Sequence, residues 1–236
     1  MQKLISKDLY RISFTLKKEF HRKVFSFVFH FIAIFLIINA ILTFVIFPVK
    51  ENSDSMGPVI VRNSLVFVSP LNLPVNRGDV YLIDKQNPAD TIFKKACDAA
   101  LRFFTFQKRG LGRDTEQLSS RMCLRRVVGL PGDTIYMKDF VIYVKSAGEK
   151  YFLTEFELTD KRYDIDVNRL PQGWDDSLGL KGSFTPITLG TTQYFVIADN
   201  RFSSLDSRLW GVLTKKDLQA KALMLYYPVK KAKIFK

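Results

Sequence analysis

The longest apolar stretch of the chain lies near its start. Residues 24–49, VFSFVFHFIAIFLIINAILTFVIFPV, contain no Asp, Glu, Lys or Arg. A membrane-spanning helix needs about 20 apolar residues, whereas the apolar core of a cleaved signal peptide has about 7–15, followed by a small-residue cleavage site. Pro48 is expected to end the helix. The pattern therefore predicts a retained transmembrane helix over residues 24–49.

The charges around this helix predict its orientation. Residues 1–23 carry seven Lys and Arg against two Asp and Glu, and positively charged flanks stay in the cytoplasm. We therefore expect a basic cytoplasmic segment at 1–23, a single membrane span, and an exported domain at 50–236. The chain has a formal net charge of +13, which favours contact with anionic membrane lipids. Its sequence has no zinc, helix-turn-helix or RNA-binding motif that would indicate nucleic acid as a partner.

Short runs of β-branched and aromatic residues, bounded by Gly, Pro and Asn, follow the apolar segment. Such runs are typical of strands. They are VIVRNSLVFVSP (59–70), GDVYLID (78–84), RRVVGLPGDTIYMKDFVIYVKS (125–146), TQYFVIADN (192–200) and ALMLYYPV (222–229). Residues 146–190 are rich in turn residues and are expected to form an insertion with weak strands. The exported part is therefore predicted to be mostly β.

Four short polar motifs interrupt these strands. They are SDSMGP (53–58), RGDV (77–80), RRVVGLPGD (125–133) and DNRFSSLDSR (199–208). Each alone is typical of an ordinary turn held by Gly, Pro, Asp and Ser. A serine hydroxyl becomes an effective nucleophile only when a base takes its proton, so one motif by itself predicts no activity.

Together, in this order and behind one membrane helix, the motifs resemble the type I signal peptidases (S26 family, bacterial leader peptidases). These are membrane-bound serine endopeptidases that remove signal peptides from exported proteins. The resemblance covers residues 24–81, 122–137 and 192–212. It implies a signal-peptidase-like β domain in the cytoplasmic membrane of a bacterium, signal peptides of exported preproteins as partners, and no metal or other cofactor.

The resemblance also implies roles for individual residues. Ser55 matches the nucleophile, Ser53 a hydroxyl that helps to bind the oxyanion, and Ser204 a serine that orients the general base. The structural charges of the family match Arg126, Asp199, Arg201, Asp206 and Arg208, and Arg126 is expected to pair with Asp199. The substrate is expected to bind in extended form along Met56, Met122, Cys123 and Leu124.

One position departs from the family pattern where the chemistry depends on it. The general base of the family is a lysine, and Arg125 stands in its place. A lysine can become neutral and accept a proton, whereas a guanidinium stays protonated in proteins. His21 and His30 precede the exported domain, and nothing in the sequence places Lys94 or Lys95 at the site.

Loss of a general base typically lowers a rate by about 10²–10⁴-fold. Two interpretations therefore stay open: a signal peptidase that uses another base, and an inactive relative that binds signal sequences or a partner. We expect little or no cleavage by the natural chain and more after Arg125→Lys, whereas robust cleavage that Ser55→Ala abolishes would indicate an active peptidase with another base.

The two cysteines, Cys97 and Cys123, have no metal-binding spacing. They are expected either to form a disulfide in an oxidising compartment or to remain two separate thiols.

Overall fold

The structure is a computed structural model of the 236-residue chain. It describes residues 2–84, 122–167, 182–202 and 205–235. The chain divides into two compact units, Met1–Leu42 and Thr43–Lys236. Each is described here by itself.

The first unit is formed by most of a single long helix, α1 (Gln2–Phe44). Its part Glu19–Phe44 is long and apolar enough to cross a membrane, and most of the side chains there are exposed. This agrees with the predicted anchor in type and place. The helix ends at Phe44, before the apolar run does, because Phe47–Lys50 pair as a strand with Leu65–Ser69. The orientation of the helix in a membrane stays a prediction.

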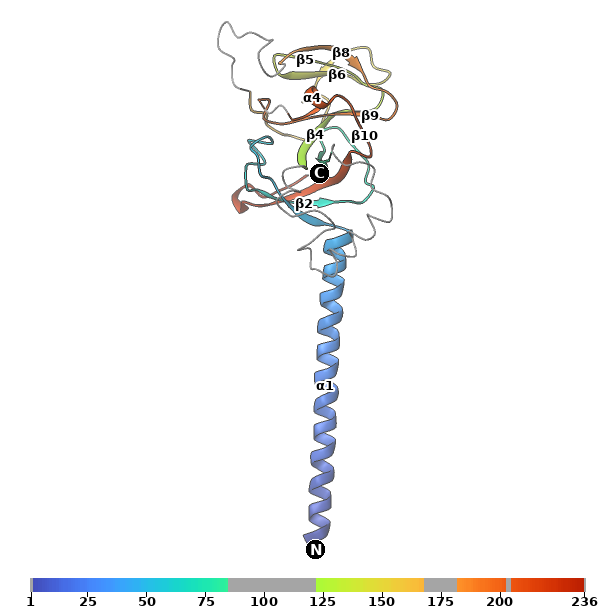
Figure 1. The fold of residues 1–236 in the computed structure, drawn as a ribbon, viewed down its shortest axis with the longest axis vertical. Helices are drawn as coiled ribbons and strands as arrows, with labels where there is room; N and C mark the ends of the chain where they lie inside the picture. Colours follow the sequence, from blue (N-terminus) through green and yellow to red (C-terminus); the bar gives the residue numbers. More distant parts are fainter. Residues whose placement is uncertain (1, 85–121, 168–181, 203–204, 236) are drawn as a thin grey trace. The chain divides into compact units, whose positions relative to one another are not determined.

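The larger sheet of the second unit contains eight antiparallel strands, and several of them are labelled in Figure 1. The strands are β1 (Phe47–Lys50), β2 (Leu65–Ser69), β3 (Val80–Ile83), β4 (Cys123–Gly129), β9 (Gln193–Ile197), β10 (Leu213–Thr214), β11 (Leu218–Tyr227) and β12 (Lys233–Ile234). Their order is β1-β2-β11-β3-β4-β9-β10, and β12 pairs with β11. The predicted mostly-β domain is confirmed.

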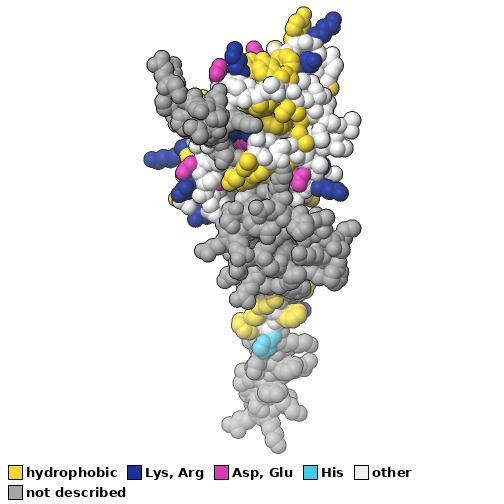
Figure 2. All heavy atoms as spheres, turned by 45° about the horizontal axis from the view of Figure 1, so that its top comes forward, with side chains coloured by type: hydrophobic (Ala, Val, Ile, Leu, Met, Phe, Trp, Pro, Cys, Tyr) yellow, Lys and Arg dark blue, Asp and Glu magenta, His cyan; other side chains and the backbone are white. Residues whose placement is uncertain are grey.

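A second sheet has four strands in the order β7-β6-β5-β8: β5 (Thr134–Lys138), β6 (Val141–Lys145), β7 (Leu153–Thr154) and β8 (Phe184–Thr188). The described part of 146–190 contributes its two outer strands, β7 and β8, so this segment joins the fold by strand pairing. Tyr136 and Tyr143 stack across β5 and β6 with ring centroids 4.8 Å apart. Figure 2 shows apolar side chains, with Lys and Arg near them, at this end of the domain.

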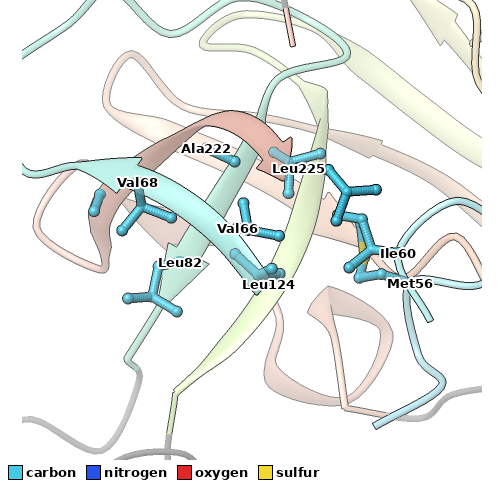
Figure 3. Close-up of a cluster of buried hydrophobic side chains, with 10 residues drawn as sticks. Met56, Ile60, Val66, Val68, Leu82, Leu124, Ala222 and Leu225 are labelled. Atoms are coloured by element: carbon cyan, nitrogen blue, oxygen red, sulfur yellow. The ribbon is translucent and has the colours of Figure 1, made fainter. Parts of the chain in front are cut away.

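One apolar cluster fixes the segment that follows β1. Alternate side chains of β2 and β11 point into it, as the two-residue period of a strand requires. Figure 3 shows its members, which are Met56, Ile60, Val66, Val68, Leu82, Leu124, Ala222 and Leu225 with their buried neighbours. Met56 is fully buried. Because Met56 follows Ser55 directly, the core anchors the backbone of that serine against the sheet.

Candidate active site

The Ser55 segment begins where β1 ends. The pairing of β1 with β2 continues beyond Lys50, since the Glu51 N–H donates to the Ser64 carbonyl (2.9 Å) and the Asn63 N–H donates to the Glu51 carbonyl (2.7 Å). Farther along, the carbonyl of Ser55 accepts a hydrogen bond from the Asn200 N–H at 2.9 Å. The segment is therefore held at both ends by backbone contacts.

Ser55 lies in a chain of short hydrogen bonds. Its side chain is 6% exposed, and its Oγ lies 2.7 Å from the Oγ of Ser53. The Ser53 hydroxyl donates to Oε1 of the buried Glu51 at 2.5 Å. The Ser53 backbone N–H donates to the same carboxylate oxygen at 3.0 Å. These contacts connect the expected nucleophile, through one hydroxyl, to a buried carboxylate.

Arg125 approaches Ser55 from β4. Its Nη1 donates to Ser55 Oγ at 2.8 Å and to the Leu124 carbonyl at 2.5 Å, and its Nε donates to the Leu205 carbonyl at 2.6 Å. The side chain is 1% exposed. Within the described residues, these hydrogen bonds all go to neutral oxygen atoms. The structure thus places Arg125 in contact with Ser55, as expected from the resemblance of their two motifs to the nucleophile and the general base of the family. Unlike a lysine, however, a guanidinium there stays a cation.

The predicted pair of Arg126 and Asp199 is present. Arg126 donates to both carboxylate oxygens of Asp199, at 2.7 and 2.5 Å, and both side chains are buried. Burial alone would lower the pKa of Arg126, but the carboxylate of Asp199 outweighs it and raises that pKa. The pair joins β4 to the residue after Ala198, where the polar loop begins, so its role is structural.

Arg201 and its partners form a second buried ionic group. Nη2 of Arg201 donates to Glu155 at 2.6 Å, and the Tyr163 hydroxyl donates to the same carboxylate oxygen at 2.7 Å. The Tyr163 ring also lies 3.8 Å from the guanidinium carbon of Arg126. Glu155 and Tyr163 could not be singled out from the sequence, because a lone acid and a lone tyrosine in a turn-rich region form no motif.

Asp206 and Arg208 fasten the far end of the same loop. Asp206 accepts from the backbone N–H of Arg208 (3.0 Å), which caps the short helix α4 (Ser207–Trp210), and from the Ala198 N–H (3.2 Å). The Arg208 guanidinium binds the same carboxylate and donates to the Arg201 carbonyl at 2.7 Å. The loop that contains Leu205 is therefore held in place beside Arg125.

The expected substrate strand lies at the first half of β4. There, Cys123 and Leu124 pair with β3, whereas the pairing with β9 begins only at Arg126. Among the described strands, the β9-facing edge of this half has no partner. Met122 and Cys123 are partly exposed, but the side chains of Leu124 and Met56 are buried in the core of Figure 3. Contact of these four residues with a substrate stays a prediction.

Some expected residues lie outside the described part of the chain. They are Ser204, Lys94, Lys95 and Cys97. Glu51 is the site residue that sequence reasoning missed. No motif pointed to it, because one carboxylate before two serines is typical of an ordinary turn, and residues 53–55 form a bend and a turn. Among the residues described, no group of three or more His, Cys, Asp or Glu side chains could hold a metal ion.

The thiol of Cys123 is free and should react slowly with alkylating reagents. Burial raises its pKa to about 11, a shift that Arg125 opposes and Glu51 reinforces. A free cysteine has a pKa of about 8.5, and the thiolate is the reactive form. The raised pKa therefore leaves about 100-fold less thiolate at about pH 8. We therefore expect iodoacetamide to modify Cys123 about 100-fold more slowly in the folded chain than in the urea-unfolded chain. Peptide mapping measures both rates. Equal rates would contradict the burial of this thiol.

The chain is similar in sequence to known signal peptidases. A family model described as signal peptidase, peptidase S26, matches residues 24–227. Signal peptidase I P of Bacillus subtilis subsp. natto is 35% identical over 107 residues, which are 45% of this chain and 51% of that protein. Signal peptidase I S of Bacillus subtilis (strain 168) is 34% identical over 106 residues, 44% of this chain and 52% of that protein. The chain therefore spans about half the length of these relatives.

Proposed function

Since this chain belongs to the signal peptidase family, peptidase S26, we propose that it is a membrane-anchored serine endopeptidase that removes signal peptides from exported proteins. The observation that carries this proposal is the Ser55 hydroxyl. It lies 2.7 Å from Ser53 and 2.8 Å from a buried cation, Arg125. Arg125 lies on β4, and the preceding residues of that strand, Cys123 and Leu124, have no partner on the β9 side among the described strands.

The proposed reaction starts with an extended signal peptide that pairs with the edge of β4 at Cys123 and Leu124. This edge has no partner among the described strands and is called the free edge of β4 below. Ser55 attacks the carbonyl carbon of the last signal residue, and the peptide bond after that residue breaks. The negative oxygen that forms is stabilised by the backbone N–H of Ser55 and by the Ser53 hydroxyl, since oriented donors lower the energy of such a charge. The acyl-enzyme is then hydrolysed by water. The family prefers small residues such as Ala at two positions before the cleaved bond.

The membrane helix accounts for where the proposed function takes place, which is the exported surface of the membrane. With the basic segment 1–23 in the cytoplasm of a bacterium, the domain that begins after Phe44 lies on the exported side of the cytoplasmic membrane. A signal peptide is itself a membrane-inserted helix that is cut at that surface. Because the enzyme is anchored in the same membrane, the effective concentration of the signal peptide at the enzyme is raised. The basic surface favours contact with anionic lipid there.

A second candidate function is binding without cleavage, and Arg125 is the observation that favours it. A guanidinium stays protonated, so this residue cannot take the Ser55 proton as the lysine of the family does. A relative that had lost its base would still present the free edge of β4 to a signal sequence. The two functions differ in whether the peptide is cut.

The test uses the full chain in lipid vesicles with a preprotein that carries a signal peptide. We expect slow scission at one bond, directly after a small residue, shown by the mass of the released protein. The matched control is a preprotein with large side chains at the two small-residue positions, which should not be cut. Vesicle-bound preprotein that stays intact, with binding that the control preprotein lacks, would support the second candidate and overturn the first.

A further inference from the structure

We propose that Glu51 accepts the proton of Ser55 through the Ser53 hydroxyl, and that Arg125 stabilises the negative charge that this transfer leaves on Ser55. The inference rests on the proposed peptidase function and names the group that replaces the missing base. We call Ser55, Ser53 and Glu51 the hydroxyl relay.

The hydrogen bonds of the relay have a defined direction. An ionised carboxylate only accepts, so the single hydrogen of the Ser53 hydroxyl points to Glu51, 2.5 Å away. The Ser53 oxygen then acts as acceptor toward Ser55, whose own hydroxyl hydrogen fills the 2.7 Å contact. On its other side the Ser55 oxygen accepts from Arg125 at 2.8 Å. Every donor therefore points from the guanidinium towards the carboxylate, which is the arrangement that a proton transfer requires.

The charge balance lowers the cost of the transfer. Arg125 is a buried cation whose described hydrogen bonds all end on neutral oxygens, and a buried charge without a direct counter-ion is costly. Before the transfer, the negative charge lies on Glu51, two hydroxyl groups from Arg125. After it, the charge lies on Ser55 Oγ, in direct contact with the guanidinium. The net charge of the site is unchanged while the opposite charges come together.

The bonds and protons of the reaction balance. The Ser55 proton moves to Ser53 as the Ser53 proton moves to Glu51, and the Ser55 oxygen bonds to the peptide carbonyl carbon. The C–N bond then breaks, and the proton held by Glu51 returns through Ser53 to the leaving amine. In the second half, water gives a proton along the same path as its oxygen bonds to the acyl carbon. The ester bond between that carbon and Ser55 Oγ then breaks, and the proton held by Glu51 returns through Ser53 to the Ser55 oxygen.

The transfer also explains how the Ser53 hydroxyl can both pass on a proton and donate to the oxyanion. In the resting site the Ser53 hydrogen points to Glu51, away from the place where an oxyanion would form. After the transfer, Ser53 carries the hydrogen that came from Ser55, on the Ser55 side. Ser53 can then donate to the oxyanion, the role that the family resemblance implies for it.

Other titratable groups around the relay do not replace Glu51. They are Arg125 and Cys123 on β4, Asp206 and Asp84, which act on the Cys123 thiol, and Asp54, which is paired with Arg62. Burial raises the pKa of Cys123 to about 11, so the thiol stays neutral near neutral pH. Asp206 is bound to Arg208. Of the groups named here, only Glu51 shares a hydrogen bond with Ser53.

The test measures acylation of Ser55 in the full chain in detergent, with the p-nitrophenyl ester of an acetylated tri-alanine peptide as the probe. Its leaving group needs no proton, so the pH dependence of the acylation rate reports how Ser55 is deprotonated and not how the leaving group is protonated. For the natural chain, we expect the rate to fall on the acid side, because a general base acts only in its unprotonated form. Glu51→Gln and Ser53→Ala should each lower the plateau about 100-fold or more and remove this acid-side fall.

Ser53→Thr is the matched control, because it keeps the hydroxyl, and it should retain the rate within about tenfold along with the acid-side fall. If Glu51 had only a structural role, Glu51→Gln would lower the acylation rate without changing its pH profile. Thermal unfolding of each variant separates a folding defect from a chemical one. If folded Glu51→Gln and Ser53→Ala acylate at the rate and with the pH profile of the natural chain, the relay is wrong and the peptidase proposal stands. If the natural chain acylates no faster than Ser55→Ala, both fail.

Discussion

Ser55→Ala is expected to lower signal-peptide cleavage by about 10⁴-fold or more, the largest effect of any single change in this chain. The reason is that the substitution removes the oxygen that bonds to the peptide carbonyl. Binding should change little, because the proposed contacts of the substrate are with the backbone of β4. The effect should therefore appear in kcat and not in KM. Cleavage of a preprotein in vesicles, followed by the mass of its product, measures it.

Thr134→Ala is a suitable control for loss of a hydroxyl. Its side chain contacts Thr188 in the second sheet at 3.1 Å and has no contact with the relay. It should leave cleavage within about twofold. Cleavage by Ser55→Ala at a comparable rate would show that the nucleophile lies elsewhere. Cys123, a partly exposed thiol beside the site, would then be the first residue to test.

Arg125→Met should have opposite effects on activity and on stability. Cleavage should fall by about 10²–10³-fold, as it does when one donor to a developing negative charge is removed. The free energy of unfolding should stay the same or rise by about 1–4 kcal/mol, because an apolar side chain of similar length replaces a buried charge. Initial cleavage rates and urea unfolding measure the two effects separately.

Arg125→Lys is the informative comparison. It keeps a cation beside Ser55 and restores a group that can become neutral and accept a proton, as in the family. We expect faster cleavage than in the natural chain, less dependence on Glu51, and a new fall in rate as the lysine is protonated. An Arg125→Met chain as active as the natural one would remove Arg125 from the mechanism.

The fold could be predicted from the sequence where a pattern has a single interpretation. The long apolar run of α1 and the alternating strands β2, β5, β6 and β11 are such cases. The end of α1 was placed too late. Phe47–Lys50 continue the apolar run, and hydrophobicity alone does not separate a helix from a strand there. Pro48 is compatible with β1 because that strand lies at the end of the sheet, where a missing N–H is tolerated.

In the candidate site, too, only the residues that belong to a recognisable motif could be predicted. The contact of Arg125 with Ser55 and the pair of Arg126 with Asp199 follow from matching motifs, and both are present. Glu51 could not be found in that way. A single carboxylate before a serine is no motif, and its burial depends on β1 pairing with β2, which the apolar run concealed.

The most direct test of the account is to locate the acyl group after the natural chain reacts with the tri-alanine ester. Trypsin should release residues 51–62 as one peptide and residues 122–125 as another, since Lys50, Arg62, Arg121 and Arg125 precede the cuts. We expect an added acyl mass on the first peptide, which fragmentation assigns to Ser55 and not to Ser53, and no such mass on that peptide in Ser55→Ala. An acyl group on Cys123 in the second peptide, or on no residue of the chain, would contradict it.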